Sequence, residues 1–525
     1  MTQQADTADT PDAPAPAPIH GPAGMALAVG AITFLRLVYL WVSPLDLHPD
    51  EAQYWSWSLA LDWGYFSKPP MVAWLIAAST AFCGTAEACV RLASPLAHAV
   101  AAGFIYGAGS CLYDRRAGFW AALLYLTLPG VSFSSLLVST DPPLLACWAA
   151  AFYVAVRLRE GEAYSLGWWA ALGVTLGLGL LSKYAMAFFL LGLVLWLIVT
   201  GSARRELLGH GRGWFGLLIA LAAAGLLILP NLVWNLENGF VTFSHTAANA
   251  NFAVPHTLAE MDLKPRKAVE FLASQLGVFG PLTLAVLLGF LIWPWSWIRD
   301  HRARMLAAFT LASLLPILAV SLLSRAHANW AATAYVAASV WVAGALCDKG
   351  AGRLGGVLLK GSILLHLAAA AAVLGGAVGQ AAPGVFWGKP VPARLEPFKY
   401  YVGWRALGEK ITAVQEKHPG LPLLSSDRMM IASALYYVSP QPVILLAWYP
   451  GGPVSDHYEL TRPWKGPLGA DALLLSLRND PAPVLARFRA HELLATLSVP
   501  VATGESRTVR VFRVRGFLGY KLGQP

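Results

Sequence analysis

The sequence predicts an all-α polytopic membrane protein that carries a small α/β domain at its C-terminal end. Three observations support this fold class. Of the 525 residues, 57% are hydrophobic and only 13% are charged, whereas a soluble domain carries about 25% charged residues. The apolar residues gather in runs of about 20, the length that crosses a bilayer. From about residue 380 the composition of the sequence changes: polar residues become more frequent, and Pro and Gly separate short apolar runs.

About eleven apolar runs are long enough to cross a membrane. Pro129 and Lys183 interrupt two of the stretches concerned. The runs lie near residues 23–43, 87–112, 117–134, 141–157, 166–182, 184–200, 214–234, 270–298, 305–323, 330–347 and 354–379.

The net charge of +9 does not indicate a nucleic-acid partner, because most basic residues lie in short connections between the apolar runs. Their clusters occupy every second connection, so the positive-inside rule places these connections and the N-terminus in the cytoplasm. The other connections, including 44–86 and 235–269, and the C-terminus are then expected on the outer side. The clusters are Arg115 and Arg116; Arg157 and Arg159; Arg204, Arg205 and Arg212; Arg299, Arg302 and Arg304; and Lys349 and Arg353.

Composition and the position of the apolar runs divide the chain into three parts. Residues 1–22 are rich in Ala, Pro, Asp and Thr and are expected to form a disordered cytoplasmic tail. Residues 23–379 form the transmembrane part, and 380–525 form an α/β domain outside the membrane. In that domain we predict a helix from Arg405 to Glu416, buried strands at Val443–Leu446 and Leu473–Leu475, and an edge strand at Thr508–Val514.

The connection 44–86 is rich in aromatic residues, which favour the boundary between membrane and water. Because its apolar runs are too short to cross, we predict interfacial helices along the outer surface. The five cysteines lie in or beside apolar runs without metal-ligand spacing, so they are expected to be core residues rather than disulfide partners or ligands. They are Cys83, Cys89, Cys111, Cys147 and Cys347.

Four charged features on the predicted outer side are candidates for chemistry. Asp50-Glu51 and Asp141 stand at expected helix starts, where capping is an alternative explanation. Lys68 precedes Pro69-Pro70, which stiffen the backbone, although a solvated loop lysine is the simpler explanation. Lys183 interrupts about 35 apolar residues and either snorkels to the surface or meets an anion. Because all four features lie on the predicted outer side, we favour a functional role over these structural alternatives.

Further basic residues join them on the same side. These are His245, Lys264, Arg266, Lys267, Arg325 and His327, for which contact with anionic headgroups is the alternative. Together the residues predict a cavity open to the outer leaflet. Its cations suit a phosphate, and its carboxylates suit a hydroxyl, an amine or a divalent cation such as Mg, Mn or Zn, with Asp50, Glu51 and Asp141 as the candidate ligands.

Four motifs carry a resemblance to a known family. They read His-Pro-Asp-Glu-Ala-Gln-Tyr-Trp (48–55), Trp-Gly-Tyr-Phe-Ser-Lys-Pro-Pro (63–70), Thr-Asp-Pro-Pro-Leu (140–144) and Leu-Ser-Lys-Tyr (181–184). Over roughly residues 25–350 the chain resembles bacterial membrane glycosyltransferases of the GT-C fold, namely the protein O-mannosyltransferase-like family and the lipid A aminoarabinose and galacturonic acid transferases. The resemblance implies an enzyme of the bacterial inner membrane that works on the periplasmic side with a sugar carried on a polyprenyl phosphate.

The resemblance also implies roles for individual residues. Asp50 matches the catalytic acidic position, Lys68 the lysine that contacts the donor phosphate, and Asp141 a second acidic position important for activity. The chain departs from the aminoarabinose transferases at Gln53, where those enzymes commonly have an arginine, and in having fewer helices.

The chemistry of the residues agrees with sugar transfer. Lys68, helped by Lys183 or Arg325, would stabilise the departing phosphate, and Asp50 or Glu51 would accept the proton of an attacking hydroxyl, with inversion at the anomeric carbon. If the acceptor is itself a phosphate, no base is needed and the carboxylates would position it or a metal. The candidate substrate contacts are Tyr54, Tyr65, His245 and His327.

The leading prediction is therefore a glycosyltransferase with a lipid or cell-envelope glycan as acceptor, embedded among membrane lipids. The alternative is a transporter or flippase of lipid-linked sugars, which would share the intramembrane charges. Transporters are commonly built from internal repeats, which this sequence does not show. A scaffold that binds a partner is a third alternative, but it leaves the charged motifs without a purpose.

Overall fold

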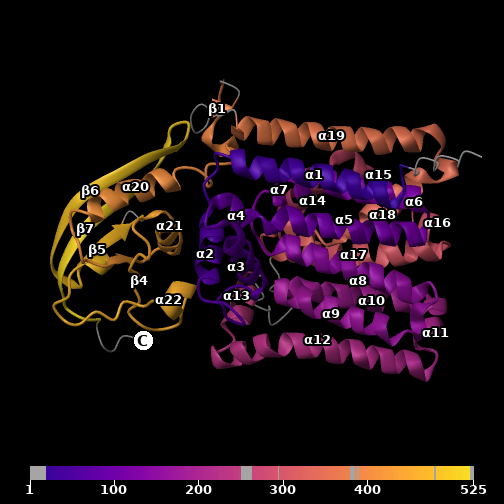
Figure 1. Cartoon of the computed structure of the whole chain (residues 1–525), viewed down its shortest axis with the longest axis horizontal. Helices are drawn as coiled ribbons and strands as arrows, with labels where there is room; N and C mark the ends of the chain where they lie inside the picture. Colours follow the sequence, from indigo (N-terminus) through magenta and orange to yellow (C-terminus); the bar gives the residue numbers. More distant parts are fainter. Residues whose placement is uncertain are drawn as a thin grey trace, which may run out of the picture.

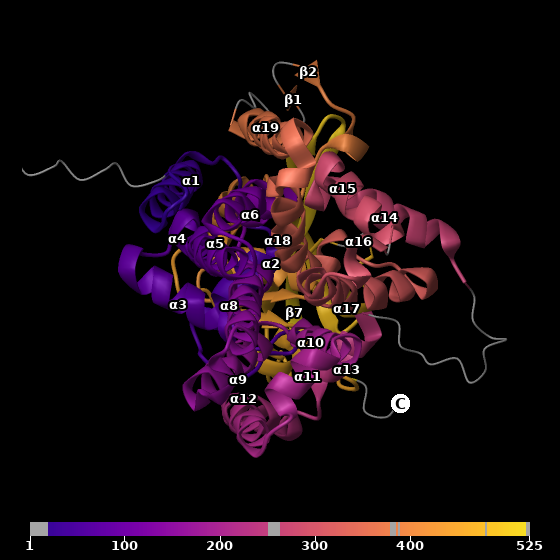
Figure 2. The same cartoon turned by 90° about the vertical axis from the view of Figure 1, so that its right-hand side faces the viewer.

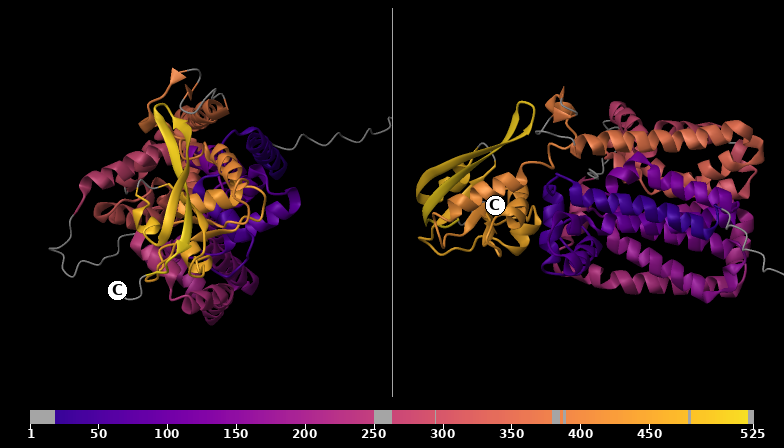
Figure 3. Two further views of the ribbon diagram at one scale, coloured as in Figure 1. Left: turned by 90° about the vertical axis from the view of Figure 1, so that its left-hand side faces the viewer. Right: turned by 45° about the horizontal axis from the view of Figure 1, so that its top comes forward.

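A computed structural model describes residues 19–249, 263–293, 295–378, 385–386, 389–477 and 480–520 of the chain. A bundle of long helices lies side by side, and a domain built on a five-stranded sheet stands at one end of it (Figures 1 and 3). Figure 2 looks at the opposite end of the bundle, with the sheet visible behind the helices. Most of the predicted tail 1–22 lies outside the described residues.

The helical part runs in sequence order through the following helices. They are α1 (Pro22–Val42), α2 (Pro49–Ser58), α3 (Met71–Cys83), α4 (Glu87–Arg91), α5 (Ala93–Leu112), α6 (Arg115–Thr127), α7 (Pro129–Ser134), α8 (Asp141–Arg159), α9 (Leu166–Ser182), α10 (Ala187–Val199), α11 (Gly201–Leu208), α12 (Gly211–Glu237), α13 (Val241–Asn249), α14 (Pro265–Phe279), α15 (Pro281–Ile292), α16 (Trp295–Ile298), α17 (His301–Leu323), α18 (Ala334–Cys347) and α19 (Gly352–Val378).

Each predicted apolar run is largely helical, but several are shorter or broken. Pro129 begins α7 and so divides the run 117–134, and Gly280, at φ 84°, divides the run 270–298. Among the described residues, five segments are by themselves long and apolar enough to cross a membrane, or six if the pair α10 and α11, bent by 109°, counts as one span. The five segments are Pro22–Val42, Glu87–Leu112, Gly211–Glu237, His301–Leu323 and Lys349–Val378.

The C-terminal domain combines a mixed sheet with short helices. The strand order is β4-β3-β5-β7-β6, in which β3 pairs in parallel with β4 and β5, and β7 pairs antiparallel with β5 and β6. The elements are β3 (Leu423–Ser425), β4 (Leu445–Ala447), β5 (Ala472–Ser476), β6 (Phe488–Ala502), β7 (Glu505–Phe517), α20 (Trp404–Gln415), α21 (Arg428–Tyr437), α22 (His457–Thr461) and α23 (Ala482–Leu485), preceded by the hairpin β1 (Val385–Phe386) and β2 (Lys389–Pro390).

The predicted helix and the two buried strands of this domain are confirmed as α20, β4 and β5. The prediction that 508–514 is an edge strand is wrong, because β7 lies between β5 and β6. Local alternation of polar and apolar residues does not reveal β6, whose middle is largely exposed.

Helix α2 connects the two parts of the molecule. Every residue of α2 except Asp50 is buried, and its aromatic residues share a hydrophobic core with α20, α21 and the sheet. Trp57, for example, stacks on Tyr65 with ring centroids 4.6 Å apart. These aromatics therefore pack mainly against the C-terminal domain, whereas their sequence pattern predicted contact with the membrane surface.

Cys83 and Cys89 form a disulfide, so the prediction that they are unpaired core residues is wrong. Helix α3 ends at Cys83, and Gly84, at φ 82°, reverses the chain so that α4 begins three residues later. This turn brings the two Cα atoms within 5.8 Å, a separation that suits a disulfide. Cys111, Cys147 and Cys347 are free thiols, as predicted.

Candidate active site

Two adjoining cavities lie where the helical bundle, the segment 44–86 and the C-terminal domain meet. The first has a volume of about 680 Å³ and the second about 450 Å³. Both are lined by Asp50, Tyr54, Lys68, His327 and Trp330. The structure thus brings the predicted residues of the first two motifs to a shared wall.

Helix α2 presents Asp50 through a capping box. The imidazole Nδ1 of His48 accepts a hydrogen bond from Asp50 N at 3.1 Å, and the carboxylate of Glu51 accepts one from His48 N at 2.9 Å. The Asp50 carboxylate pairs with the guanidinium of Arg428 at 2.7 Å. Burial alone would raise the pKa of the Asp50 carboxyl, but Arg428, His48 and Lys68 together lower it below its ordinary value, which keeps the group ionised.

The neighbouring carboxylate of Glu51 is buried and fully engaged. Arg91 donates to it through Nε at 2.9 Å and Nη2 at 2.7 Å, and Val138 N donates at 2.8 Å. With His48 N, four donors meet a group that has about four lone-pair sites. Glu51 therefore ties α2 to α4 and to the segment before α8.

Lys68 is held on a tight turn beside Asp50. Tyr65 N donates to Lys68 O at 3.1 Å, while the Tyr65 hydroxyl donates to Trp57 O at 3.2 Å. Tyr65 thus supports the turn and does not line either cavity. Within the described part of the chain, the Lys68 ammonium has no hydrogen bond or ion pair. Burial, reinforced by the nearby charge of Lys183, lowers the pKa of Lys68, so an anion bound there would be stabilised.

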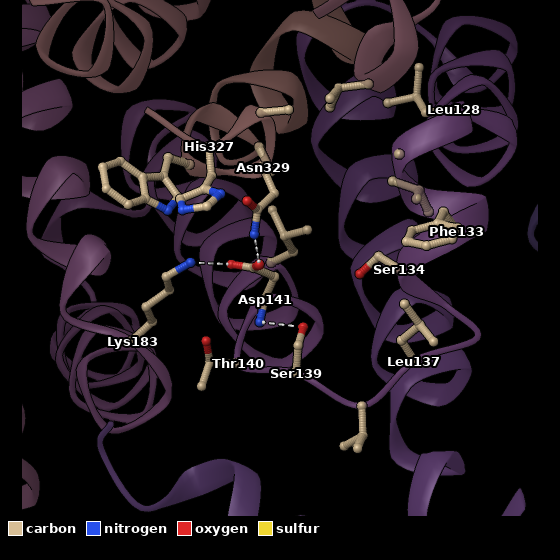
Figure 4. A pocket seen from close by; sticks show the side chains of 18 of the residues that line it. Leu128, Phe133, Ser134, Leu137, Ser139, Thr140, Asp141, Lys183, His327 and Asn329 are labelled. Atoms are coloured by element: carbon tan, nitrogen blue, oxygen red, sulfur yellow. Dashed lines mark hydrogen bonds and ion pairs between the residues drawn. The ribbon is translucent and has the colours of Figure 1, made fainter. Parts of the chain in front are cut away.

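Asp141 and Lys183, which the sequence placed on one side of the membrane, form an ion pair. Lys183 Nζ lies 2.6 Å from Asp141 Oδ1, and Asn329 Nδ2 donates to Asp141 Oδ2 at 2.6 Å. Figure 4 shows both side chains converging on Asp141, with the apolar side chains of Leu128, Phe133 and Leu137 lining the same cavity. The first cavity therefore combines a charged wall with an apolar one.

The remaining predicted residues divide between the cavities and the surface. His245 lines the second cavity, and its ring lies 5.3 Å from that of Phe66. His327 lines both cavities beside Trp330, at a ring distance of 5.3 Å. Burial lowers the pKa of both imidazoles, and the surrounding cations lower it further. Arg325 is exposed and lines neither cavity.

The carboxylates do not fit a metal site. Among the described residues, no group of three or more His, Cys, Asp or Glu side chains is placed to hold an ion. Asp50, Glu51 and Asp141 each contact a cationic side chain instead.

The structure adds residues that the motifs did not single out. Arg91 and Asn329 donate hydrogen bonds to Glu51 and Asp141, and the pair Asn329-Trp330 resembles a later segment of the same family. Arg428 contacts Asp50 across 378 residues of sequence, and no local pattern marks it.

The fold and part of the sequence match known proteins. The model of the dolichyl-phosphate-mannose-protein mannosyltransferase family matches residues 67–234. Two structures of ArnT from Cupriavidus metallidurans, one in the apo state and one bound to undecaprenyl phosphate, superpose on this chain with a TM-score of 0.61 and 16% identity. Each alignment covers 94% of this chain and 98% of the ArnT chain. These matches agree with the resemblance seen in the motifs: the fold is that of ArnT, and residues 67–234 match the mannosyltransferase family model.

Two relatives in sequence are named as glycosyltransferases. The lipid A galacturonosyltransferase of Rhizobium johnstonii is 35% identical over 324 residues, which are 60% of this chain and 64% of that protein. The undecaprenyl phosphate-α-4-amino-4-deoxy-L-arabinose arabinosyl transferase of Pseudomonas aeruginosa is 32% identical over 209 residues, 36% of this chain and 37% of that protein. The chain therefore matches less than two thirds of the length of either relative.

Proposed function

We propose that the chain is a glycosyltransferase that moves a sugar from a polyprenyl-phosphate donor to a lipid A-type acceptor. The observation that carries this proposal is that the Asp50 carboxylate and the Lys68 ammonium, which has no ion pair within the described residues, lie on a wall shared by both cavities. A base for a hydroxyl and a cation for a phosphate are the two groups that such a transfer requires. The names of the two relatives supply the substrate classes.

The first cavity suits the donor. Lys68 is placed to contact the phosphate and to stabilise the charge that develops as the sugar–phosphate bond breaks. The ion pair of Asp141 and Lys183 forms part of the charged wall of the same cavity. Leu128 and Phe133 supply apolar surface for the start of a polyprenyl chain.

Asp50 is the proposed base. As the acceptor hydroxyl attacks the anomeric carbon, its proton passes to the Asp50 carboxylate while the phosphate leaves with the bonding electron pair. Attack opposite the leaving group inverts the anomeric carbon. Glu51, which four donors engage, is assigned to positioning α2 rather than to proton transfer.

The periplasmic side of the bacterial inner membrane is the proposed location of these cavities. The basic connections assign the opposite face to the cytoplasm. The disulfide of Cys83 and Cys89, close to the C-terminal domain, supports an oxidising compartment for this end of the molecule.

The test is sugar transfer by purified protein in detergent, with polyprenyl-phosphate-linked galacturonic acid as the first donor and lipid A as the first acceptor. The Asp50→Asn variant is expected to insert and to bind donor but to lose transfer. Asp480→Asn, an exposed carboxylate of the C-terminal domain, is the matched control and should keep full activity. Normal transfer by Asp50→Asn would remove Asp50 from the mechanism, and donor movement across vesicles without any transfer would favour a flippase.

A further inference from the structure

The C-terminal domain supplies a side chain that reaches the proposed base. Arg428 Nη1 lies 2.7 Å from Asp50 Oδ1 and 2.6 Å from Gln53 Oε1. Asp50 and Gln53 are three residues apart on α2 and so share one face of the helix. A single guanidinium nitrogen therefore bridges both side chains and fixes one oxygen of the carboxylate. The other oxygen lies 3.8 Å from His48 Nδ1.

Local structure holds Arg428 at this point. It is the first residue of α21, three residues beyond the end of β3. The Asp427 side chain accepts a hydrogen bond from Met430 N at 3.0 Å and so caps the helix. Side chains at the carboxyl ends of parallel strands commonly face a ligand crevice. A cation in the first turn is unfavourable with respect to the helix dipole, so helix stability does not account for an arginine here.

The pair also contributes little to docking the domain. Both side chains are partly exposed, at 36% for Arg428 and 45% for Asp50, and exposed pairs add little to stability. The domain is attached by other contacts. Tyr436 packs edge-on against Trp55 at 4.8 Å, and Trp404 N donates to the buried Asp46 Oδ2 at 2.7 Å. Removing Arg428 should therefore leave the domain in place.

The second cavity indicates what this arrangement serves. Its wall combines Asp50 and Gln53 from α2 with Arg428, Ser455 and Asp456 from the C-terminal domain. The cavity is thus incomplete without that domain, and it opens onto the carboxylate that Arg428 orients.

We propose that Arg428 is a positioning residue of the active site, which aligns Asp50 toward an acceptor in the second cavity and makes transfer depend on the C-terminal domain. This inference rests on the proposed function. It assigns the C-terminal domain a part in building the reaction centre.

The charges around Asp50 give the proposal a pH signature. His48, Lys68, His245 and Arg428 face the carboxylate with positive or titratable groups, Tyr54 lies against it, and the charge of Glu51 is matched by Arg91. Arg428 is the largest of the influences that lower the pKa of Asp50. Without it the pKa rises, so the acid limb of the pH profile moves to higher pH.

The experiment compares Arg428→Gln and Arg428→Lys with the wild type in kcat, donor KM and pH dependence. Misplacement of a catalytic group costs about 100-fold in rate. We expect Arg428→Gln to lose about that factor in kcat at neutral pH, to recover part of it at higher pH, and to keep its donor KM. Arg428→Lys should retain more activity. Arg515→Gln removes an exposed pair with Glu492 in the same domain and should change neither quantity.

A second variant separates positioning from folding. Gln53→Arg in the Arg428→Gln background returns a cation to the same face of α2, and we expect it to restore part of kcat and to shift the acid limb back. The pKa of Asp50, measured by infrared difference titration against Asp50→Asn, is independent of transfer. An unchanged Asp50 pKa in Arg428→Gln would overturn the inference even if the substrates were wrong, as would wild-type kcat in that variant. Inactivity of the wild type with a shifted pKa would count against the proposed function alone.

Discussion

Replacing Glu51 tests whether this residue positions α2 or transfers a proton. In Glu51→Gln the Arg91 guanidinium loses its carboxylate partner while it stays buried, because its side chain is only 2% exposed. Breaking a buried ion pair by removing one partner costs about 3–5 kcal/mol. Against a total stability of about 5–15 kcal/mol, the variant is expected to lose roughly a fifth or more of its free energy of unfolding. Because each 1.4 kcal/mol is a factor of ten in an equilibrium constant, the ratio of unfolded to folded protein would rise roughly 100- to 3,000-fold.

Denaturant titration in detergent micelles, followed by circular dichroism, measures this loss. Arg91→Met and the double variant Glu51→Gln/Arg91→Met complete a cycle, in which we expect a coupling free energy of about 3 kcal/mol. Glu492→Gln removes the exposed pair with Arg515 and serves as the control, with an expected change of at most about 0.5 kcal/mol. If Glu51→Gln unfolded like the wild type but transferred no sugar, the positioning role would be refuted and Glu51 would act in catalysis.

Three further predictions concern the first cavity and the turn after α3. Lys68→Gln is expected to raise the donor KM about 10- to 100-fold, because it removes a hydrogen bond to a charged group. Lys68→Arg should keep most of the affinity, and equal KM values for both variants would argue against phosphate contact. Lys183→Met leaves Asp141 with Asn329 as its partner, so we expect a lower unfolding midpoint that Lys183→Met/Asp141→Asn partly recovers, and no recovery would show that the pair is not coupled. Cys89→Ser is expected to cost about 2 kcal/mol of stability, because the disulfide closes a loop over a separation of six residues, and reductant should lower the wild-type midpoint to the same level and leave the variant unchanged.

The cysteines and the aromatic residues show where local patterns mislead. Cys83 and Cys89 lie beside apolar runs in the sequence, which is typical of core thiols, but the reversal at Gly84 brings them together. Trp57 belongs to an aromatic-rich connection that suggested the membrane surface, but it is buried between α2 and the C-terminal domain. In both cases the outcome depends on a turn or a packing partner that periodicity does not encode.

The sequence by itself determined the helical membrane architecture, the α/β character of the C-terminal region and the motif residues Asp50, Lys68 and Asp141. These follow from run length, charge pattern and residue order, which are local properties of a chain. The partners of the charged groups were decided only by the tertiary structure. Glu51 meets Arg91 and Asp50 meets Arg428 across 40 and 378 residues of sequence, and such long-range contacts leave no mark on either segment alone.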